Sequence, residues 1–257
     1  MVGLWLLWWL CHLALVIPSS SSQTRIVGGK ETTISEVPYL VYLRQSGNFI
    51  CGGSLISTRV VLSAAHCVYG SQPDDYTIHA GASRLDQEAP VVRNVAMFHT
   101  SPSYSATNFD MDVALLALQE AVFLIPGQIA TISPCRNPPE GNAYARISGW
   151  GVTRENNRQP AEQVRTAMVR VLPGAECKLS YSGYGQLSDS MLCAAVRGIR
   201  DSCSGDSGGP LVYRGQVCGI VSWGFGCARP AFPGVYTNVA SARVHDFIEQ
   251  TLRRIGN

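Results

Sequence analysis

The sequence has few charged residues and lacks repeats, low-complexity tracts and any run rich in Lys or Arg. Only 15% of the 257 residues are charged and the net charge is +2. A protein that binds nucleic acid needs a basic surface, so these features argue against nucleic acid as the main partner. Hydrophobic residues make up 46% of the chain, which is long enough to bury a substantial core.

The apolar run at the N-terminus is shorter than a typical membrane-spanning helix. Residues 2–17 are sixteen mostly apolar residues, whereas a spanning helix needs about 20. Pro18 ends the run, and the serines that follow are small residues of the kind found at signal-peptidase sites. We therefore expect a cleaved signal peptide over residues 1–22 and a secreted, extracellular protein without stable membrane association. An uncleaved anchor is the alternative, because no Lys or Arg precedes the run.

The sequence contains no CxxC pair and no N-x-S/T sequon. N-glycosylation is therefore not expected, and a cysteine-ligated metal centre is not indicated. Of the nine cysteines, Cys11 lies in the signal peptide, which leaves eight. An even number of cysteines in an exported chain predicts four disulfides.

Short runs rich in β-branched and aromatic residues follow the N-terminal segment, separated by Gly, Pro, Asn and Ser. This pattern predicts an all-β protein of the sandwich or barrel kind. The clearest runs are residues 39–43, 60–62, 113–117, 169–172 and 217–221. Helical periodicity occurs once, near the C-terminus, where we expect a helix that packs on the core and ends at Gly256. Its apolar face consists of Val244, Phe247, Ile248, Leu252 and Ile255.

His66 has the surroundings that a general base needs. Most histidines are structural, but His66 follows the small residues Ala64 and Ala65 and precedes Cys67, a residue that can anchor the segment through a disulfide. A base that works in catalysis must be held at one angle, and such neighbours hold it. His66 is therefore the candidate base among the five histidines.

Two carboxylates precede the apolar run at 113–117. A carboxylate that leads into a buried strand is costly to bury unless it is paired. Asp112 adjoins the run directly, so we expect it to be the buried and paired member. Asp110 fits a solvated turn residue.

Residues 201–210 read DSCSGDSGGP and form the most specific motif of the chain. Glycines on both sides of Ser207 permit a tight turn and a close approach of substrate. The amide N–H groups of Gly205 and Ser207 can point together at one oxyanion. An ordinary surface turn would leave Asp201 and Asp206 unexplained.

Seven motifs, taken in order, resemble the chymotrypsin-like serine proteases of the trypsin type. They are RIVGG (25–29), SAAHC (63–67), DVALL (112–116), ISGWG (147–151), GDSGGP (205–210), VSWG (221–224) and PGVYTNV (233–239). The resemblance runs from Ile26 to the C-terminus and points to secreted invertebrate trypsins. It implies two six-stranded antiparallel β-barrels with a C-terminal α-helix, in a peptidase domain over 26–257 whose barrels join near 120–135.

The resemblance also implies a mechanism. Ser207 would be the nucleophile, His66 the base that takes its proton, and Asp112 the carboxylate that orients His66. The N–H groups of Gly205 and Ser207 would form the oxyanion hole. A non-catalytic homologue that acts as a binding adaptor is the competing hypothesis, but such proteins usually lack one of these three side chains.

Specificity follows from the same resemblance. Asp201 would lie at the base of the primary pocket and select Arg or Lys. Residues that would bind substrate with it are Ser202, Ser222, Trp223, Gly224 and Gly234. Glycine at the pocket walls leaves room for a long side chain, and the 222–224 strand would pair with the substrate backbone. Phe109 would border the next subsite and favour small or apolar residues there, and Ser204 would leave the pocket entrance less covered.

Activation is implied by cleavage between Arg25 and Ile26, which would remove a propeptide of residues 23–25. The freed ammonium of Ile26 would pair with Asp206, an expensive charge to bury alone, so the intact chain is expected to be a zymogen. Because Arg25 itself suits a trypsin-like site, the enzyme could activate itself.

The remaining expectations concern disulfides, metals and partners. The resemblance implies Cys51–Cys67, Cys177–Cys193 and Cys203–Cys227, with Cys135–Cys218 as the remaining pair. The calcium loop of vertebrate trypsins corresponds to 81–90, which has too few acids, so no metal or other cofactor is expected. We expect a monomer that meets protein or peptide substrates and serine protease inhibitors, with self-cleavage sites at Arg154 and Arg158. A digestive role and a cascade role both stay open.

Overall fold

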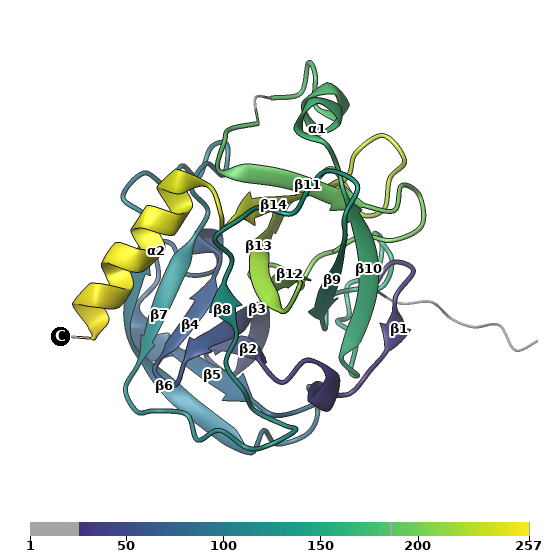
Figure 1. Ribbon diagram of the computed structural model, residues 1–257. Coiled ribbons are helices and arrows are strands. Elements are labelled where there is room, and N and C mark those ends of the chain that lie inside the picture. Colours follow the sequence, from purple (N-terminus) through teal and green to yellow (C-terminus); the bar gives the residue numbers. More distant parts are fainter. Residues whose placement is uncertain (1–25, 186, 257) are drawn as a thin grey trace, which may run out of the picture.

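The computed structural model describes residues 26–185 and 187–256, which form two β-barrels and a C-terminal helix (Figure 1). The expected signal peptide over 1–22 and the propeptide with Arg25 lie outside the described residues. No helix within the described ranges is long and apolar enough to cross a membrane.

The first barrel is a closed ring in the order β2-β3-β4-β7-β6-β5, and all its neighbouring strands are antiparallel. Its strands are β2 (Leu40–Gln45), β3 (Asn48–Ser57), β4 (Val60–Ser63), β5 (Tyr76–Ala80), β6 (Val91–Thr100) and β7 (Ala114–Leu118). Buried aliphatic side chains such as Leu43, Leu55 and Leu115 fill its interior. Buried and half-buried residues alternate along β5, which is the pattern of a strand with one face in the core.

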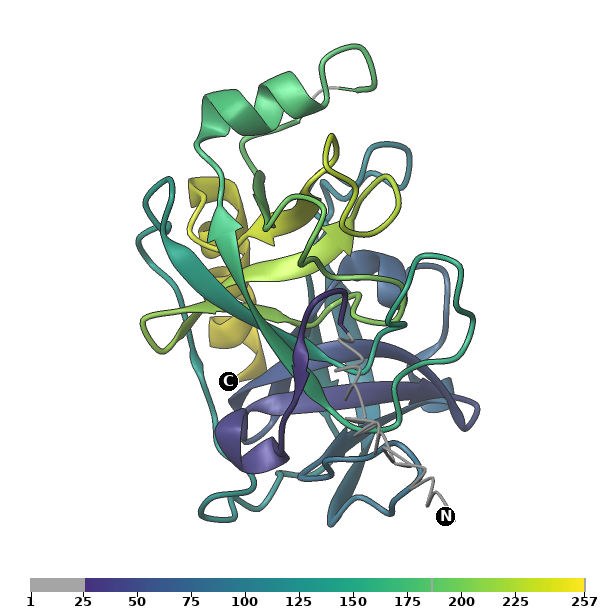
Figure 2. The ribbon, with the colours of Figure 1, turned by 90° about the vertical axis from the view of Figure 1, so that its right-hand side faces the viewer.

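The second barrel closes through the pairings β9-β10-β11-β14-β13-β12-β9, again antiparallel. Its strands are β9 (Tyr144–Gly149), β10 (Arg165–Val171), β11 (Met191–Ala195), β12 (Pro210–Tyr213), β13 (Gln216–Trp223) and β14 (Gly234–Asn238). Two short strands add to it, β1 (Lys30–Glu31) on β10 and β8 (Ser133–Pro134) parallel to β13. Figure 2 shows the two barrels one above the other, with the purple and blue first barrel below.

The helices are few. Residues 26–185 and 187–256 contain two α-helices, α1 (Gly174–Ser180) and α2 (Ala242–Ile255), and three short 3-10 helices at Ile34–Glu36, Ala65–Cys67 and Pro73–Asp75. The expected C-terminal helix is confirmed: Val244 and Ile248 are fully buried, and Gly256 follows its last turn. The sequence periodicity misses α1, because a seven-residue helix is too short to show an amphipathic repeat.

Helix α2 fastens the two barrels together. It follows β14 of the second barrel and runs alongside β7 of the first (Figure 1). Its buried residues belong to a hydrophobic cluster that includes residues of both barrels, for example Leu115 and Ile220. The expected fold class is therefore confirmed, and the barrels share one continuous core.

The described part of the chain contains four disulfides, and their pairs are the ones that the sequence analysis expects. They are Cys51–Cys67, Cys135–Cys218, Cys177–Cys193 and Cys203–Cys227. The first joins β3 to the turn that carries His66, and the last joins two segments that carry Asp201 and Gly226. Each such crosslink contributes about 2–5 kcal/mol to a secreted domain.

Candidate active site

His66 and Asp112 meet because their strands pair. Strand β4 leads into the turn of His66, Asp112 lies just before β7, and Ser63 of β4 is in register with Ala114 of β7. The ring atom Nδ1 of His66 lies 2.8 Å from Asp112 Oδ2. The backbone N–H of His66 also donates to Asp112 Oδ1 at 2.9 Å. One carboxylate therefore holds both the backbone and the ring of the histidine, which fixes the ring at one angle.

Asp112 is fully buried, as its position next to the strand predicts. Besides His66, it accepts a hydrogen bond of 2.5 Å from Ser222 Oγ, while Thr237 Oγ1 donates to its backbone carbonyl at 2.7 Å. A buried carboxylate needs such partners. The sequence motif assigns Ser222 to the substrate backbone only and misses this contact. The available signal was a hydroxyl inside the otherwise apolar strand β13.

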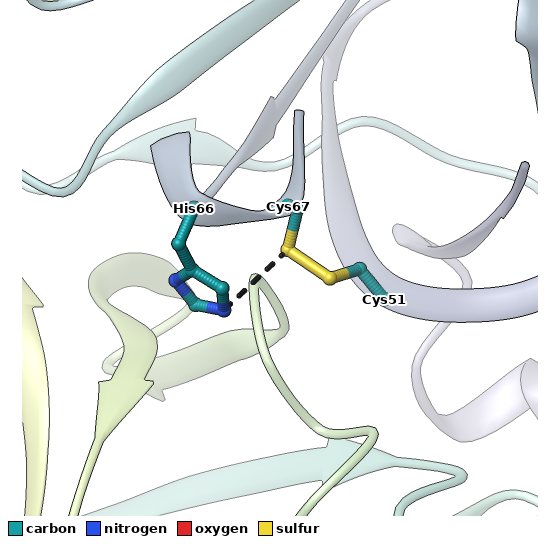
Figure 3. A group of neighbouring side chains, drawn as sticks. All are labelled: Cys51, His66 and Cys67. Carbon is teal, nitrogen blue, oxygen red and sulfur yellow. Dashed lines mark hydrogen bonds between the residues drawn. A yellow bond between two sulfur atoms is a disulfide. The ribbon is translucent and has the colours of Figure 1, made fainter. Parts of the chain in front are cut away.

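The other ring nitrogen of His66, Nε2, lies 3.8 Å from Cys67 Sγ of the Cys51–Cys67 disulfide (Figure 3). The three side chains are close enough together to resemble a metal site. Both cysteines are oxidised to the disulfide, so only the imidazole could ligate and the group is not a metal centre. The disulfide instead braces the turn that carries the ring.

Ser207 lies in the turn that precedes β12, and this turn packs directly on the first barrel. Its carbonyl accepts a hydrogen bond of 2.8 Å from the Gly52 N–H of β3. Gly208 has a φ of +76°, and a Cβ at this position would overlap Ser63 Oγ, three residues before His66. Only glycine combines that backbone angle with so close an approach.

The described residues contain no hydrogen bond between Ser207 and His66. The row of hydrogen-bonded groups therefore extends from Ser222 through Asp112 to His66 and stops there. Hydrogen bonds of catalytic groups are often long in an enzyme without substrate and shorten in the reacting complex.

The amide groups around Ser207 are free to bind an anion. Gly205 adopts a φ of +90°, and neither its N–H nor that of Ser207 donates to any group within the described part of the chain. Two free N–H groups next to a serine hydroxyl match the geometry of an oxyanion hole.

A pocket of about 270 Å³ opens beside Ser207. Ser202, Ser222, Trp223, Gly224 and Gly234 line it. The Asp201 carboxylate lies directly behind Gly234, where a Cβ would overlap its Oδ1. A wider depression of about 890 Å³ between β1 and β10 contains none of the residues expected in the site.

Asp201 is only 1% exposed and has no cationic partner among the described residues. It accepts hydrogen bonds from the N–H groups of Ser202 at 2.9 Å and Ala228 at 3.1 Å. Burial outweighs these bonds and raises the pKa of Asp201 to about 7, with the charge of Asp206 adding to the effect. A buried carboxylate without a positively charged partner among the described residues therefore lies behind Gly234, one of the residues that line the pocket.

The pocket differs from the sequence expectation in two details. Ser202 Oγ already accepts a hydrogen bond of 3.1 Å from Tyr236 Oη, so it is oriented before any ligand arrives. Glu155 lines the entrance and forms an ion pair with Arg229. Nothing in the sequence signals Glu155, because it lies in a loop outside all seven motifs.

Asp206 is a second buried carboxylate, 2% exposed. Its oxygens accept hydrogen bonds from Gly151 N–H at 2.8 Å and Cys203 N–H at 3.0 Å. Burial raises the pKa of Asp206 to about 6, despite those bonds. A Cβ at Gly149 or Gly151 would overlap the carboxylate, which explains the two glycines of the ISGWG motif.

The segment after Arg25 enters the same region. Ile26 is fully buried, and the carbonyl of Val27 accepts a hydrogen bond of 3.3 Å from the Asp201 N–H. The N-terminal residues of the described chain therefore run beside the segment that carries Asp201 and Asp206.

Phe109 and Asp110 border the site. The Phe109 ring stands edge-on to the His66 ring, with 5.8 Å between the centroids. Asp110 is not the solvated turn residue that the sequence suggests: it forms an ion pair with Arg243 at 2.9 Å and accepts hydrogen bonds from two serines. These partners lie far away in sequence, which is why the local pattern does not reveal them.

Comparison with known proteins agrees with this geometry. The model of the Trypsin family matches residues 26–248. The chain is 40% identical to Seminase of Drosophila melanogaster over 88% of this chain and 82% of that protein. It is 39% identical to Trypsin delta of Drosophila erecta, over 91% of this chain and 92% of that protein. Among solved structures, neuropsin, a serine protease expressed in the limbic system of mouse brain, superposes with a TM-score of 0.80 at 30% identity, over 87% of this chain and 98% of that one.

The chain therefore belongs to the trypsin family of serine proteases. It is a trypsin-like serine endopeptidase, a hydrolase of peptide bonds, and the expected resemblance to invertebrate trypsins is confirmed. The adaptor hypothesis is set aside.

The contact between Gly234 and Asp201 predicts that alanine substitutions at two glycines of the same pocket lower the free energy of unfolding by different amounts. Gly234→Ala places a Cβ on the Asp201 carboxylate and should lower the free energy of unfolding by about 1–3 kcal/mol. In Gly224→Ala the added Cβ would lie 3.6 Å and 3.8 Å from its nearest neighbours, which is ordinary contact. The free energy of unfolding should therefore change by no more than about 0.5 kcal/mol. Urea unfolding in a Ser207→Ala background, which prevents self-digestion, measures both. Equal costs for the two variants would contradict the packing described here.

Proposed function

We propose that this endopeptidase is secreted, cleaves after Arg or Lys, and is made as a zymogen that is activated between Arg25 and Ile26. The observation that supports the specificity most directly is the buried carboxylate of Asp201 behind Gly234 of the pocket wall, without a cation among the described residues. A substrate guanidinium or ammonium is the group that this carboxylate lacks.

The chemistry follows from the residues around the pocket. A serine hydroxyl is too weak an acid to attack a carbonyl at neutral pH, so Ser207 needs the base His66 to take its proton. Asp112 keeps Nδ1 of His66 protonated through the 2.8 Å contact, which leaves Nε2 to accept the proton and later to deliver it to the leaving amine. The free N–H groups of Gly205 and Ser207 stabilise the negative charge on the carbonyl oxygen of the tetrahedral intermediate.

Recognition of the substrate divides between the pocket and the strand beside it. Gly224 and Gly234 leave the pocket walls without side chains, so a long basic side chain can extend to Asp201. Ser202 Oγ lies beside that carboxylate and offers a hydroxyl acceptor to the ammonium of a Lys. Residues 222–224, at the end of β13, pair with the substrate backbone, which adds a strand beside them.

Activation follows from the charge of Asp206. Buried without a cation, this carboxylate destabilises the segment that contains Gly205 and Ser207. Cleavage after Arg25 creates an ammonium on Ile26, whose side chain is already buried in the core. The ion pair between that ammonium and Asp206 orders the oxyanion hole and the pocket, so that an intact chain has little activity.

The biological setting follows from the same proposal. An N-terminal signal peptide and four disulfides suit an extracellular protease that acts as a monomer. Its partners are proteins or peptides with Arg or Lys before the cleaved bond, and serine protease inhibitors that occupy the same pocket.

The first test removes the pocket charge. Asp201→Ser should reduce kcat/KM on Arg and Lys peptides by about 10⁴-fold, because the substrate cation then loses its buried partner. Ser207 of the variant should still react with a fluorophosphonate, which shows that the nucleophile is intact. Asp74→Ser, which removes an exposed carboxylate far from the pocket in sequence, is the control and should leave kcat/KM unchanged. Undiminished cleavage after Arg in Asp201→Ser would refute the specificity.

The raised pKa of Asp201 predicts a pH-dependent affinity for a cation. Benzamidine binds the ionised carboxylate, so its affinity for a Ser207→Ala protein that begins at Ile26 should weaken by up to about tenfold between pH 8 and pH 6. The pKa is higher in the folded protein than the value of 3.8 in an unfolded chain, so the stability that protonated Asp201 contributes is lost as the pH rises from about 4 to about 7. Benzamidine should accordingly raise Tm more at pH 8 than at pH 6. Calorimetric titration measures the affinity; Asp201→Asn should abolish its pH dependence, and a flat wild-type profile would contradict the assignment.

Activation is tested at the cleavage site itself. Treatment with an active trypsin should raise the activity of the wild-type chain and expose Ile26 as its N-terminus, whereas Arg25→Gln should remain about 10²–10³-fold less active. Arg158→Gln removes a different basic residue and should activate normally. Peptide hydrolysis and N-terminal sequencing provide the readouts, and full activity of uncleaved Arg25→Gln would rule out the zymogen.

A further inference from the structure

The turn at residues 109–112 carries two neighbours of His66 and touches the second barrel at successive positions. The backbone N–H of Met111 donates to Ser190 Oγ at 3.1 Å, and the carbonyl of Asp112 accepts from Thr237 Oγ1 at 2.7 Å. The turn itself belongs to the first barrel, since it leads into β7. It is therefore one of the places where the two barrels are held in register at the site.

Asp110 makes several contacts of this kind. Its Oδ1 accepts hydrogen bonds from Ser188 Oγ at 2.6 Å and from Ser190 Oγ at 2.7 Å, and its Oδ2 pairs with Arg243 of α2 at 2.9 Å. Arg243 also reaches Asp189 at 3.1 Å. Burial opposes the ionisation of Asp110, but the bonds from Arg243 and the serines prevail and hold its pKa below the usual range. One carboxylate thus joins the turn to two segments of the second half of the chain.

The backbone of the turn requires such an anchor. Phe109 has a φ of +60° and Met111 a φ of +53°, so both residues beside Asp110 adopt the left-handed conformation that side chains with a Cβ disfavour. Two such residues persist only where their surroundings determine the conformation. The same backbone orientation places the Phe109 ring against the His66 ring and the Asp112 carboxylate on His66 Nδ1.

We propose that Asp110 is a positioning residue for peptide hydrolysis. Its carboxylate anchors the 109–112 turn to the second barrel, and the anchored turn fixes Asp112 and Phe109 around the imidazole of His66. The inference rests on the proposed catalytic role of His66 and Asp112. It adds that Asp110 influences both the rate of hydrolysis and the preference for the residue before the cleaved Arg or Lys.

The test compares Asp110→Ala and Arg243→Gln with the wild-type enzyme. Each protein is first activated by cleavage after Arg25, and its concentration of active sites is measured by titration of Ser207. Two peptides that differ only in a small or a bulky residue before Arg serve as substrates. In Asp110→Ala we expect kcat to fall by about 10- to 100-fold, because small displacements of catalytic groups are costly. The preference between the two peptides should also shrink, since the Phe109 ring is released. Benzamidine affinity should stay the same, since the pocket is not involved.

Arg243→Gln should show the same changes in a weaker form, because it removes the ion pair with Asp110 but leaves the bonds from the two serines. The double variant should resemble Asp110→Ala, because both substitutions remove the same ion pair. Arg243→Gln also serves if Asp110→Ala does not fold. The control is Arg253→Gln, which breaks an exposed ion pair of the same helix, 3.9 Å from Glu249, and should change neither rate nor preference.

Two outcomes would overturn the inference. If the wild type is active and Asp110→Ala and Arg243→Gln lower Tm without changing kcat per titrated site or the peptide preference, Asp110 has only a structural role. If the activated wild type neither hydrolyses Arg peptides nor labels at Ser207, the proposed function fails, and this inference fails with it.

Discussion

The burial of three carboxylates, those of Asp112, Asp201 and Asp206, is the constraint on which the rest of the structure depends. Each is at most 2% exposed, and an unpaired buried charge costs several kcal/mol. Backbone N–H groups of tight turns supply donors to all three: His66 for Asp112, Ser202 and Ala228 for Asp201, Cys203 and Gly151 for Asp206. The turns around the site, with their glycines and disulfides, are shaped by this requirement.

The two barrels contribute different parts of the site, so the site depends on their packing. His66 and Asp112 come from the first barrel, and Ser207 and Asp201 from the second. Ser222 of the second barrel donates to Asp112 of the first, and Gly52 of the first donates to the carbonyl of Ser207. Helix α2 adds an apolar connection, because it leaves the second barrel and packs along β7. A small shift between the barrels would therefore move the nucleophile relative to its base.

The sequence predicts the fold class correctly and proposes the candidate residues, because the signals for both are local. The motif around Ser207 shows its glycines directly, and the position of Asp112 before an apolar strand indicates its burial. The contacts that the sequence misses join distant residues: Ser222 and Asp112 are 110 positions apart, and Arg243 and Asp110 are 133 apart. Such pairs are set by how the barrels pack, and no periodicity or motif in a single sequence encodes them. Helix α1 is missed for a different reason, since it is too short to show a repeat.

Asp201 and Asp206 differ from Asp112 in one decisive respect. Asp112 has the ring of His66 as a permanent partner, whereas the other two have only neutral donors among the described residues, and burial raises the pKa of both. The charge of Asp206 also raises the pKa of Asp201, so a cation at one carboxylate makes the other easier to ionise. The cations proposed here are the ammonium of Ile26 for Asp206 and a substrate side chain for Asp201. Neutralising Asp206 on activation would then do more than order a loop: it would lower the cost of the charged form of Asp201 and so prepare the pocket for its substrate. The same electrostatic coupling requires the converse, that a cation bound in the pocket favours insertion of the new N-terminus, because linkage between two sites is reciprocal.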